Sequence, residues 1–126
     1  MITREEILMG RENQYPLTKE LESNLRQLLV HLNQFRTYYA IPMQVSSGYR
    51  PGSFNSSLTN AAKKSNHMVC LACDFKDTDG KLAKFCLENT HILELFSLYL
   101  ENPASTVGWV HLQITSPKSG SRVFNP

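Results

Sequence analysis

The chain has 126 residues, 41% of them hydrophobic, and a formal net charge of +2 at pH 7. This length suits one domain with a real core, residues 1–126, and is too short for two domains. The charges are spread along the sequence, which argues against a nucleic-acid partner. A faintly basic surface would suit an anionic polymer such as a cell wall.

The N-terminal segment lacks the basic and apolar regions of a signal peptide. No apolar run approaches the roughly 18 residues that a transmembrane helix needs. We therefore expect cytoplasmic synthesis and no membrane insertion. The cysteines, Cys70, Cys73 and Cys86, are odd in number, which agrees with a reducing compartment and argues against a disulfide framework.

The N-terminal half predicts two helices. Thr3 and Glu6 form a capping-box pattern for a short helix that Gly10 closes. A longer helix is expected from near Thr18, because apolar residues recur there with a 3.6-residue period. They are Leu21, Leu25, Leu28, Leu29, Leu32, Phe35 and Tyr39. A short strand over residues 43–46 and a long loop over 47–66, with a helical turn around 61–64, should follow.

The C-terminal half predicts short strands around one helix. The expected elements are a buried strand at 71–75, a turn at 77–80, a helix at 81–89, and strands near 97–100 and 109–114. The helix should bury Leu82, Phe85 and Cys86, and the apolar pair Val123 and Phe124 should let the tail dock on the body. The predicted fold class is α+β, with helices packed against a small, mainly antiparallel sheet.

The candidate metal ligands are His67, Asp74 and His111. Alternation along the last strand sets His111 on the more open face, opposite Val110 and Leu112. The seven residues from His67 to Asp74 would span about 23 Å as a straight strand at roughly 3.3 Å per residue. Zinc ligands lie about 2 Å from their ion, so the chain must turn back between the two residues if both bind. Alternatively, Asp74 caps a strand end and His67 faces solvent, and the sequence spacing leaves both interpretations open.

The pair Cys70 and Cys73 has the spacing of redox and structural-zinc sites. Structural zinc usually needs a second Cys/His pair, and a redox pair is expected at the start of a helix. Neither context is present in the sequence, and Cys73 falls inside a predicted strand. We predict buried, inert thiols.

Several segments resemble the zinc D,D-carboxypeptidase and L-alanyl-D-glutamate endopeptidase family, which includes peptidoglycan-cutting phage endolysins and D-Ala-D-Ala dipeptidases. Ser65, His67, Ala72 and Asp74 match its Ser-x-His-x-x-Gly-x-Ala-x-Asp motif position by position. The run Ser47-Gly48-Tyr49-Arg50, with Asn55, resembles its Ser-Gly-Tyr-Arg segment, and Trp109-x-His111 resembles its last zinc-ligand motif.

The resemblance implies a zinc peptidase that hydrolyses an amide bond in peptidoglycan stem peptides. Zinc would be held by His67, Asp74 and His111 in a cleft on the sheet, and Arg50 would stabilise the oxyanion. The candidate substrate-binding residues are Ser65, Trp109 and Gln113, although Ser65 also suits loop ordering and Trp109 core packing. We expect a monomer of bacteriophage or prophage type that acts on the cell wall after release or as part of a virion.

Two positions depart from the family pattern. Cys70 replaces the motif's glycine, at a cost of about 1–2 kcal/mol if the backbone there is left-handed. Gly108 stands where the family usually carries its general base, three residues before the last zinc histidine. We predict Glu101, just before the loop over residues 102–108, as the replacement base. The missing base also motivates a rival, a catalytically silent zinc-binding module of the cell wall or of virion assembly, and a weaker rival is a Cys70/Cys73 thiol protein.

Overall fold

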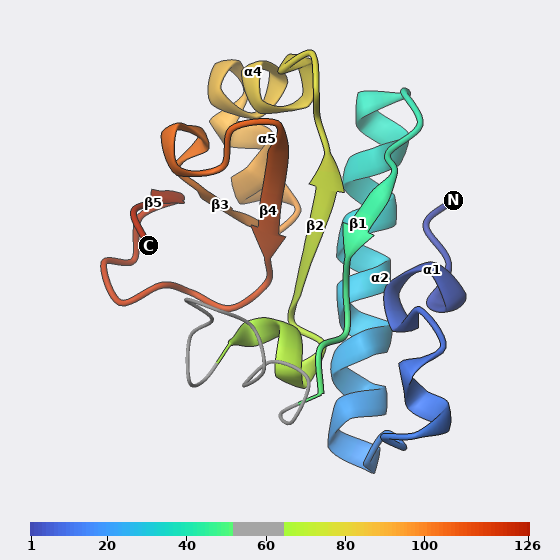
Figure 1. The fold of residues 1–126 in the computed structure, drawn as a ribbon. Helices are drawn as coiled ribbons and strands as arrows, with labels where there is room; N and C mark the ends of the chain where they lie inside the picture. The colour runs from blue at the N-terminus through green and yellow to red at the C-terminus, as the bar shows by residue number, and fades with distance from the viewer. Residues whose placement is uncertain (52–64) are drawn as a thin grey trace.

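Figure 1 shows the fold in a computed structural model, which describes residues 1–51 and 65–126. The predicted helical turn around residues 61–64, and Asn55, lie outside the described residues. The helices are α1 (Arg4–Leu8), α2 (Lys19–Tyr39), α4 (Lys81–Glu88) and α5 (Thr90–Leu95). The strands are β1 (Val45–Ser47), β2 (Ala72–Lys76), β3 (Tyr99–Glu101), β4 (Trp109–Gln113) and β5 (Val123–Phe124).

The predicted helix starts of the N-terminal half are confirmed. The hydroxyl of Thr3 accepts from the backbone N–H of Glu6, whose carboxylate accepts in return, so the capping box is complete. Thr18 caps α2 by accepting from the N–H of Leu21. Arg4 ties the two helices together through paired hydrogen bonds to the carboxylate of Glu22.

The sheet has five strands in the order β1-β2-β4-β3-β5. Strands β1, β2, β4 and β3 pair antiparallel, and β5 runs parallel to β3. This arrangement confirms the predicted α+β class with a mainly antiparallel sheet. It also sets β2 and β4, which carry Asp74 and His111, side by side near the middle of the sheet.

The core lies between the sheet and the long helix, which runs behind β1 and β2 in Figure 1. The helix buries Leu25, Leu28, Leu32 and Phe35 completely, as its 3.6-residue pattern predicted. Each such burial stabilises the fold by about 1.5–3 kcal/mol. From the sheet, Cys73, Phe75, Val110 and Leu112 join the same cluster. Their neighbours along each strand therefore point to the opposite face, where the candidate ligands lie.

Three elements differ from expectation. β1 begins at Val45 and extends to Ser47, and β3 begins at Tyr99 because Ser97 takes a left-handed conformation with φ of 54°. Helix α5 was not predicted, since its six residues are too few for a periodic pattern. The expected docking of Val123 and Phe124 is confirmed, and it forms strand β5. Among residues 1–51 and 65–126, no helix combines the length and apolar character that crossing a membrane requires.

Candidate metal centre

The chain between His67 and Asp74 turns back on itself. A 3-10 helix spans Asn66–Val69, and the hydroxyl of Ser65 caps it by accepting from the N–H of His67 at 3.1 Å. Cys70 then adopts a left-handed conformation with φ of 57°, at the position where the family motif has glycine. The reversal confirms the interpretation with His67 before the turn and Asp74 on the strand. The alternative interpretation, in which His67 faces solvent, is wrong, because the exposed fraction of this residue is 1%.

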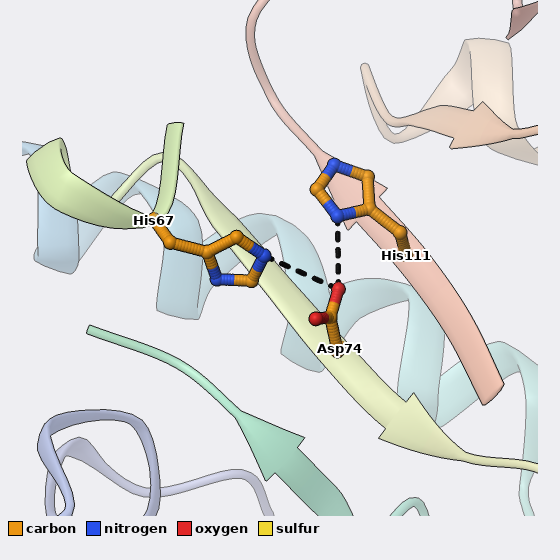
Figure 2. A group of neighbouring side chains, drawn as sticks. All are labelled: His67, Asp74 and His111. Atoms are coloured by element: carbon orange, nitrogen blue, oxygen red, sulfur yellow. Dashed lines mark hydrogen bonds and ion pairs between the residues drawn. The ribbon is translucent and has the colours of Figure 1, made fainter. Parts of the chain in front are cut away.

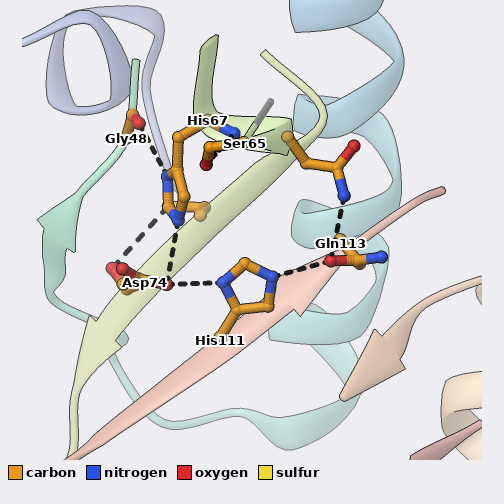
Figure 3. A network of polar contacts seen from close by, with 8 residues as sticks. Gly48, Ser65, His67, Asp74, His111 and Gln113 are labelled. Carbon is orange, nitrogen blue, oxygen red and sulfur yellow. Dashed lines mark hydrogen bonds and ion pairs between the residues drawn. The ribbon is translucent and has the colours of Figure 1, made fainter. Parts of the chain in front are cut away.

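The ring of His67 is oriented by the backbone of Gly48. Its Nδ1 lies 2.8 Å from the carbonyl oxygen of Gly48 (Figure 3). A carbonyl only accepts, so in the neutral ring Nδ1 carries the proton and Nε2 carries the lone pair. That Nε2 is buried, has no hydrogen-bond partner among the described residues, and lies 3.2 Å from Oδ1 of Asp74. Two acceptor atoms thus face each other, an arrangement that a cation between them would stabilise.

Gly48 holds this position through close packing against α1. A Cβ atom on Gly48 would lie 2.2 Å from the carbonyl oxygen of Ile7, a distance that no side chain tolerates. The N–H of Tyr49 donates to the same oxygen at 2.8 Å. The strand can therefore approach the helix this closely only with glycine, and the approach fixes the acceptor for His67.

Asp74 and His111 meet across the two central strands. Their Cα atoms are register partners, and Oδ1 of Asp74 lies 2.8 Å from Nδ1 of His111 (Figure 2). Burial raises the pKa of Asp74, but the interactions with the imidazoles of His111 and His67 outweigh burial and hold the pKa at about 2. For His111, burial lowers the pKa, and the interaction with the Asp74 carboxylate reverses that effect and raises it. The carboxylate is therefore ionised at neutral pH and available to a cation.

The donor set fits a catalytic zinc ion. The ligand atoms of His67, Asp74 and His111 all lie within 4.8 Å of one another, and all belong to buried residues. Two imidazole nitrogens and one carboxylate oxygen are a usual protein ligand set for catalytic zinc, each about 2 Å from the ion. The lone pair of His67 Nε2 has no other described partner, which is a further reason for the fit.

The backbone of Arg50 is hydrogen-bonded to His67, which with Asp74 and His111 forms the metal-capable group. Its N–H donates to the carbonyl oxygen of His67 at 3.0 Å, and its half-buried side chain has an Nε with no hydrogen-bond partner among the described residues. A second guanidinium, that of Arg11, donates to the carbonyl oxygen of Tyr49 at 2.7 Å. Burial, and then the charge of Arg50, lower the pKa of Arg11, so the two cations lie near each other.

Glu101 ends β3 beside the metal-capable group. Tyr99 pairs with Gln113 and Leu100 with Leu112, so continuing the register sets Glu101 opposite His111 on the same face. Burial raises the pKa of Glu101, and the charges of His111, Asp74 and His67 also act on it. Gly108 precedes β4 with φ of 87° and contributes no side chain. Of these two positions, only Glu101 therefore presents a titratable group to this region.

The C-terminal strand covers one side of His111. Phe124 in β5 contacts the imidazole edge to face, with ring centroids 6.2 Å apart. The strand register pairs Phe124 with Glu101, and the carbonyl oxygen of Phe124 accepts from the N–H of Asn102 at 2.7 Å. The exposed fraction of His111 is 8%, so the open surface expected around this residue is wrong. His111 is buried through tertiary contacts, because Phe124 of the C-terminal tail and Gln113 at the end of β4 cover its ring.

The candidate substrate-binding residues have different surroundings. Ser65 caps the turn that carries His67, as described above. Trp109 is half-buried and lines a surface pocket with Asp77, Thr106 and Gly108. Gln113 has an exposed fraction of 4%, and its amide contacts His111 (Figure 3). The same amide also contacts Asn66 and Thr115. The residues that sequence reasoning missed are Gly48, as a carbonyl acceptor, and Asn66, for which no sequence pattern gives a signal.

The cysteines are buried in the core and not in the metal-capable group. Burial raises the pKa of Cys70 and of Cys86 to about 12, and raises that of Cys73 well above its ordinary value. A thiol nucleophile or redox pair needs a lowered pKa and access to solvent. The prediction of buried thiols is confirmed.

Comparison with known proteins gives one match. The family model described as Peptidase M15 matches residues 2–112, which is most of the chain. No curated protein and no solved structure matches. The matched segment contains His67, Asp74 and His111 and ends immediately before Gln113.

Proposed function

Because the chain belongs to the peptidase M15 family, and is therefore a zinc-dependent peptidase, we propose that it hydrolyses an amide bond in the stem peptides of peptidoglycan. The observation that carries the proposal is the buried group of His67, Asp74 and His111, whose ligand atoms lie within 4.8 Å of one another. We assign these three side chains as the zinc ligands. With three protein ligands, a bound zinc would have a fourth position for water or substrate, as catalytic zinc requires.

Two observations support peptidoglycan as the substrate. The segments 47–50, 65–74 and 109–111 resemble a family that includes peptidoglycan-cutting endolysins and D-Ala-D-Ala dipeptidases. The net charge of +2 favours an anionic polymer such as the cell wall. We further propose a phage or prophage protein that acts on the cell wall after release or as part of a virion.

Arg50 is assigned to the oxyanion. Zinc, when bound, polarises the scissile carbonyl and lowers the pKa of water from 15.7 to about 7. Arg50 donates hydrogen bonds to the carbonyl oxygen as negative charge develops there, which stabilises the transition state. Its support is the backbone bond to His67 and an Nε that no described residue satisfies.

Glu101 is assigned as general base. Its carboxylate accepts the proton of the attacking water and returns it to the nitrogen of the leaving amine, so the hydrolysis balances. Its support is the β3–β4 register, which continues to His111, and its electrostatic interaction with all three proposed ligands. Burial raises its pKa toward the working range of a base.

The test uses purified full-length protein, zinc and purified peptidoglycan. We expect new free amino groups to appear, chelation to abolish their release, and added zinc to restore it. Stoichiometric zinc binding without release from any peptidoglycan type would contradict the proposed substrate. Mass spectrometry of the products would identify the bond cut.

A second candidate is a zinc-binding module of the cell wall or of virion assembly that has no catalytic activity. The observation that favours it is Gly108, which cannot move a proton at the position where the family carries its base. This candidate predicts one zinc ion per chain, binding to peptidoglycan in a pull-down, and no hydrolysis. Unchanged hydrolysis by a Glu101→Gln variant would exclude Glu101 as the base but not the peptidase itself.

A further inference from the structure

The amide of Gln113 has one possible orientation. On one side it lies 2.7 Å from the backbone carbonyl oxygen of Thr115, which accepts and cannot donate. The group on that side must therefore be the NH₂, and the amide oxygen must lie on the other side. That oxygen is 2.8 Å from Nε2 of His111 (Figure 3). It is also 3.2 Å from the amide nitrogen of Asn66.

An acceptor at this position selects one form of the His111 ring. A neutral imidazole carries a proton on one nitrogen and a lone pair on the other. Both ring nitrogens of His111 face an acceptor, Gln113 at Nε2 and Asp74 at Nδ1. When a cation takes the place of a proton between Nδ1 and Asp74, the Gln113 oxygen keeps the remaining proton on Nε2, and the lone pair is on Nδ1. Nδ1 is the nitrogen that lies 2.8 Å from Asp74. The amide therefore directs the lone pair toward the carboxylate and toward His67.

We propose that Gln113 is a positioning residue of this peptidase: its amide oxygen holds neutral His111 in the Nε2–H form and makes Nδ1 the metal-binding atom. The inference rests on the proposed assignment of His111 as a zinc ligand. Gly48 has the complementary role for His67, where the carbonyl holds the proton on Nδ1 and leaves Nε2 to bind. The two rings thus bind through different nitrogens, each because of the acceptor on its far side. Partners of this kind typically contribute about 10–100-fold in metal affinity.

The contacts of Gln113 allow a matched pair of variants. Gln113→Leu removes both the acceptor and the NH₂ group with little change in volume. Gln113→Glu also removes the NH₂ group, and with it the bond to Thr115, but keeps an acceptor oxygen for His111. A residue that only stabilised the fold through Thr115 would make the two variants equally defective. A residue that orients His111 would make them differ.

The experiment measures zinc affinity by competition with a chromophoric chelator, together with thermal unfolding of the metal-free proteins. We expect Gln113→Leu to bind zinc about 10–100-fold more weakly than the wild type, and Gln113→Glu to bind at least as tightly as the wild type. In zinc-loaded wild-type protein, long-range ¹H–¹⁵N spectra should show His111 protonated at Nε2, with that proton protected from exchange. In Gln113→Leu the protection should be lost.

Equal zinc affinity in the wild type and Gln113→Leu would overturn the inference, as would equal weakening in both variants. A wild-type spectrum with the His111 proton on Nδ1 would overturn it directly. If Gln113→Leu does not fold, Asn66→Ala gives the test in a milder form. Asn66 donates to the same amide oxygen of Gln113, so its loss should leave that oxygen less firmly held and should speed exchange of the His111 Nε2 proton. Wild-type protein that binds no zinc would instead contradict the proposed ligand set, so the two failures are distinguishable.

Discussion

Asp74 and His111 are direct cross-strand partners, and Oδ1 of the aspartate lies 2.8 Å from Nδ1 of the histidine. The same oxygen lies 3.2 Å from Nε2 of His67. One carboxylate oxygen thus contacts both imidazoles. The register of β2 with β4 makes this possible, because it sets Asp74 directly opposite His111. A shift of one residue in that register would point Asp74 and His111 to opposite faces of the sheet.

Asp74→Asn should abolish tight zinc binding, because the amide supplies no negative charge to the ion. We expect zinc affinity to fall by more than the roughly 10–100-fold typical of losing an outer hydrogen-bond partner. Chelator competition measures the change. The exposed Asp79→Asn serves as the control and should bind zinc like the wild type. Wild-type affinity in Asp74→Asn would remove Asp74 from the ligand set.

Gly48→Ala should lower both stability and zinc affinity. The new Cβ would lie 2.2 Å from the carbonyl oxygen of Ile7, so the strand must move and carry the acceptor for His67 with it. Steric overpacking of this kind costs about 1–3 kcal/mol in the free energy of unfolding, which denaturant titration measures. Gly120→Ala is the control, since Gly120 has φ of +70° but no atom within 4 Å of the added Cβ. It should lose stability through backbone strain and keep its zinc affinity.

Glu101→Gln should reduce turnover while zinc stays bound. The amide keeps the shape of the side chain but cannot accept a proton, and general bases contribute about 10²–10⁴-fold to rate. Rates of peptidoglycan hydrolysis and zinc content should be measured on the same preparation. The exposed Glu94→Gln is the matched control and should retain full turnover. Loss of zinc together with activity would show that Glu101 acts on the ligands and not on the proton.

Arg50→Lys should reduce kcat by about 10²–10³-fold, the usual cost of removing one oxyanion donor. Lysine retains the positive charge but lacks the planar fork of donors that guanidinium offers. Steady-state kinetics on a soluble stem peptide separates kcat from KM. The exposed Arg26→Lys controls for the chemical change itself. A raised KM with unchanged kcat would assign Arg50 to substrate binding instead.

The thiols should resist alkylation in the folded protein. With burial raising the pKa of Cys70 and Cys86 to about 12, only about one thiol in 10,000 is ionised at pH 8, and reactivity should rise only as pH approaches that value. Iodoacetamide labelling followed by mass spectrometry should modify neither residue at pH 8 and should modify both in denaturant. Rapid labelling of the native protein would revive the alternative of a thiol protein.

The local patterns of the sequence were sufficient for most of the helices. The 3.6-residue repeat of α2 and the capping box at Thr3 depend on neighbours within one or two turns, so they can be recognised without tertiary information. The spacing from Ser65 to Asp74 and the alternation around His111 made these residues candidates and left two interpretations open, and it is the resemblance to the peptidase family that implied their role as zinc ligands. The short helix α5 and the start of β3 were not recoverable, because six residues or fewer carry little periodicity.

The sequence by itself, through its resemblance to the peptidase family, predicted His67, Asp74 and His111 as metal ligands and determined that glycine stands at position 108, where the family carries its base. Only the tertiary structure decided how they are held. The acceptors for the two imidazoles come from Gly48 and Gln113, and Glu101 is near the site through strand pairing. The physical reason is that hydrogen-bond direction and strand register arise between segments far apart in the chain, and no local pattern encodes them.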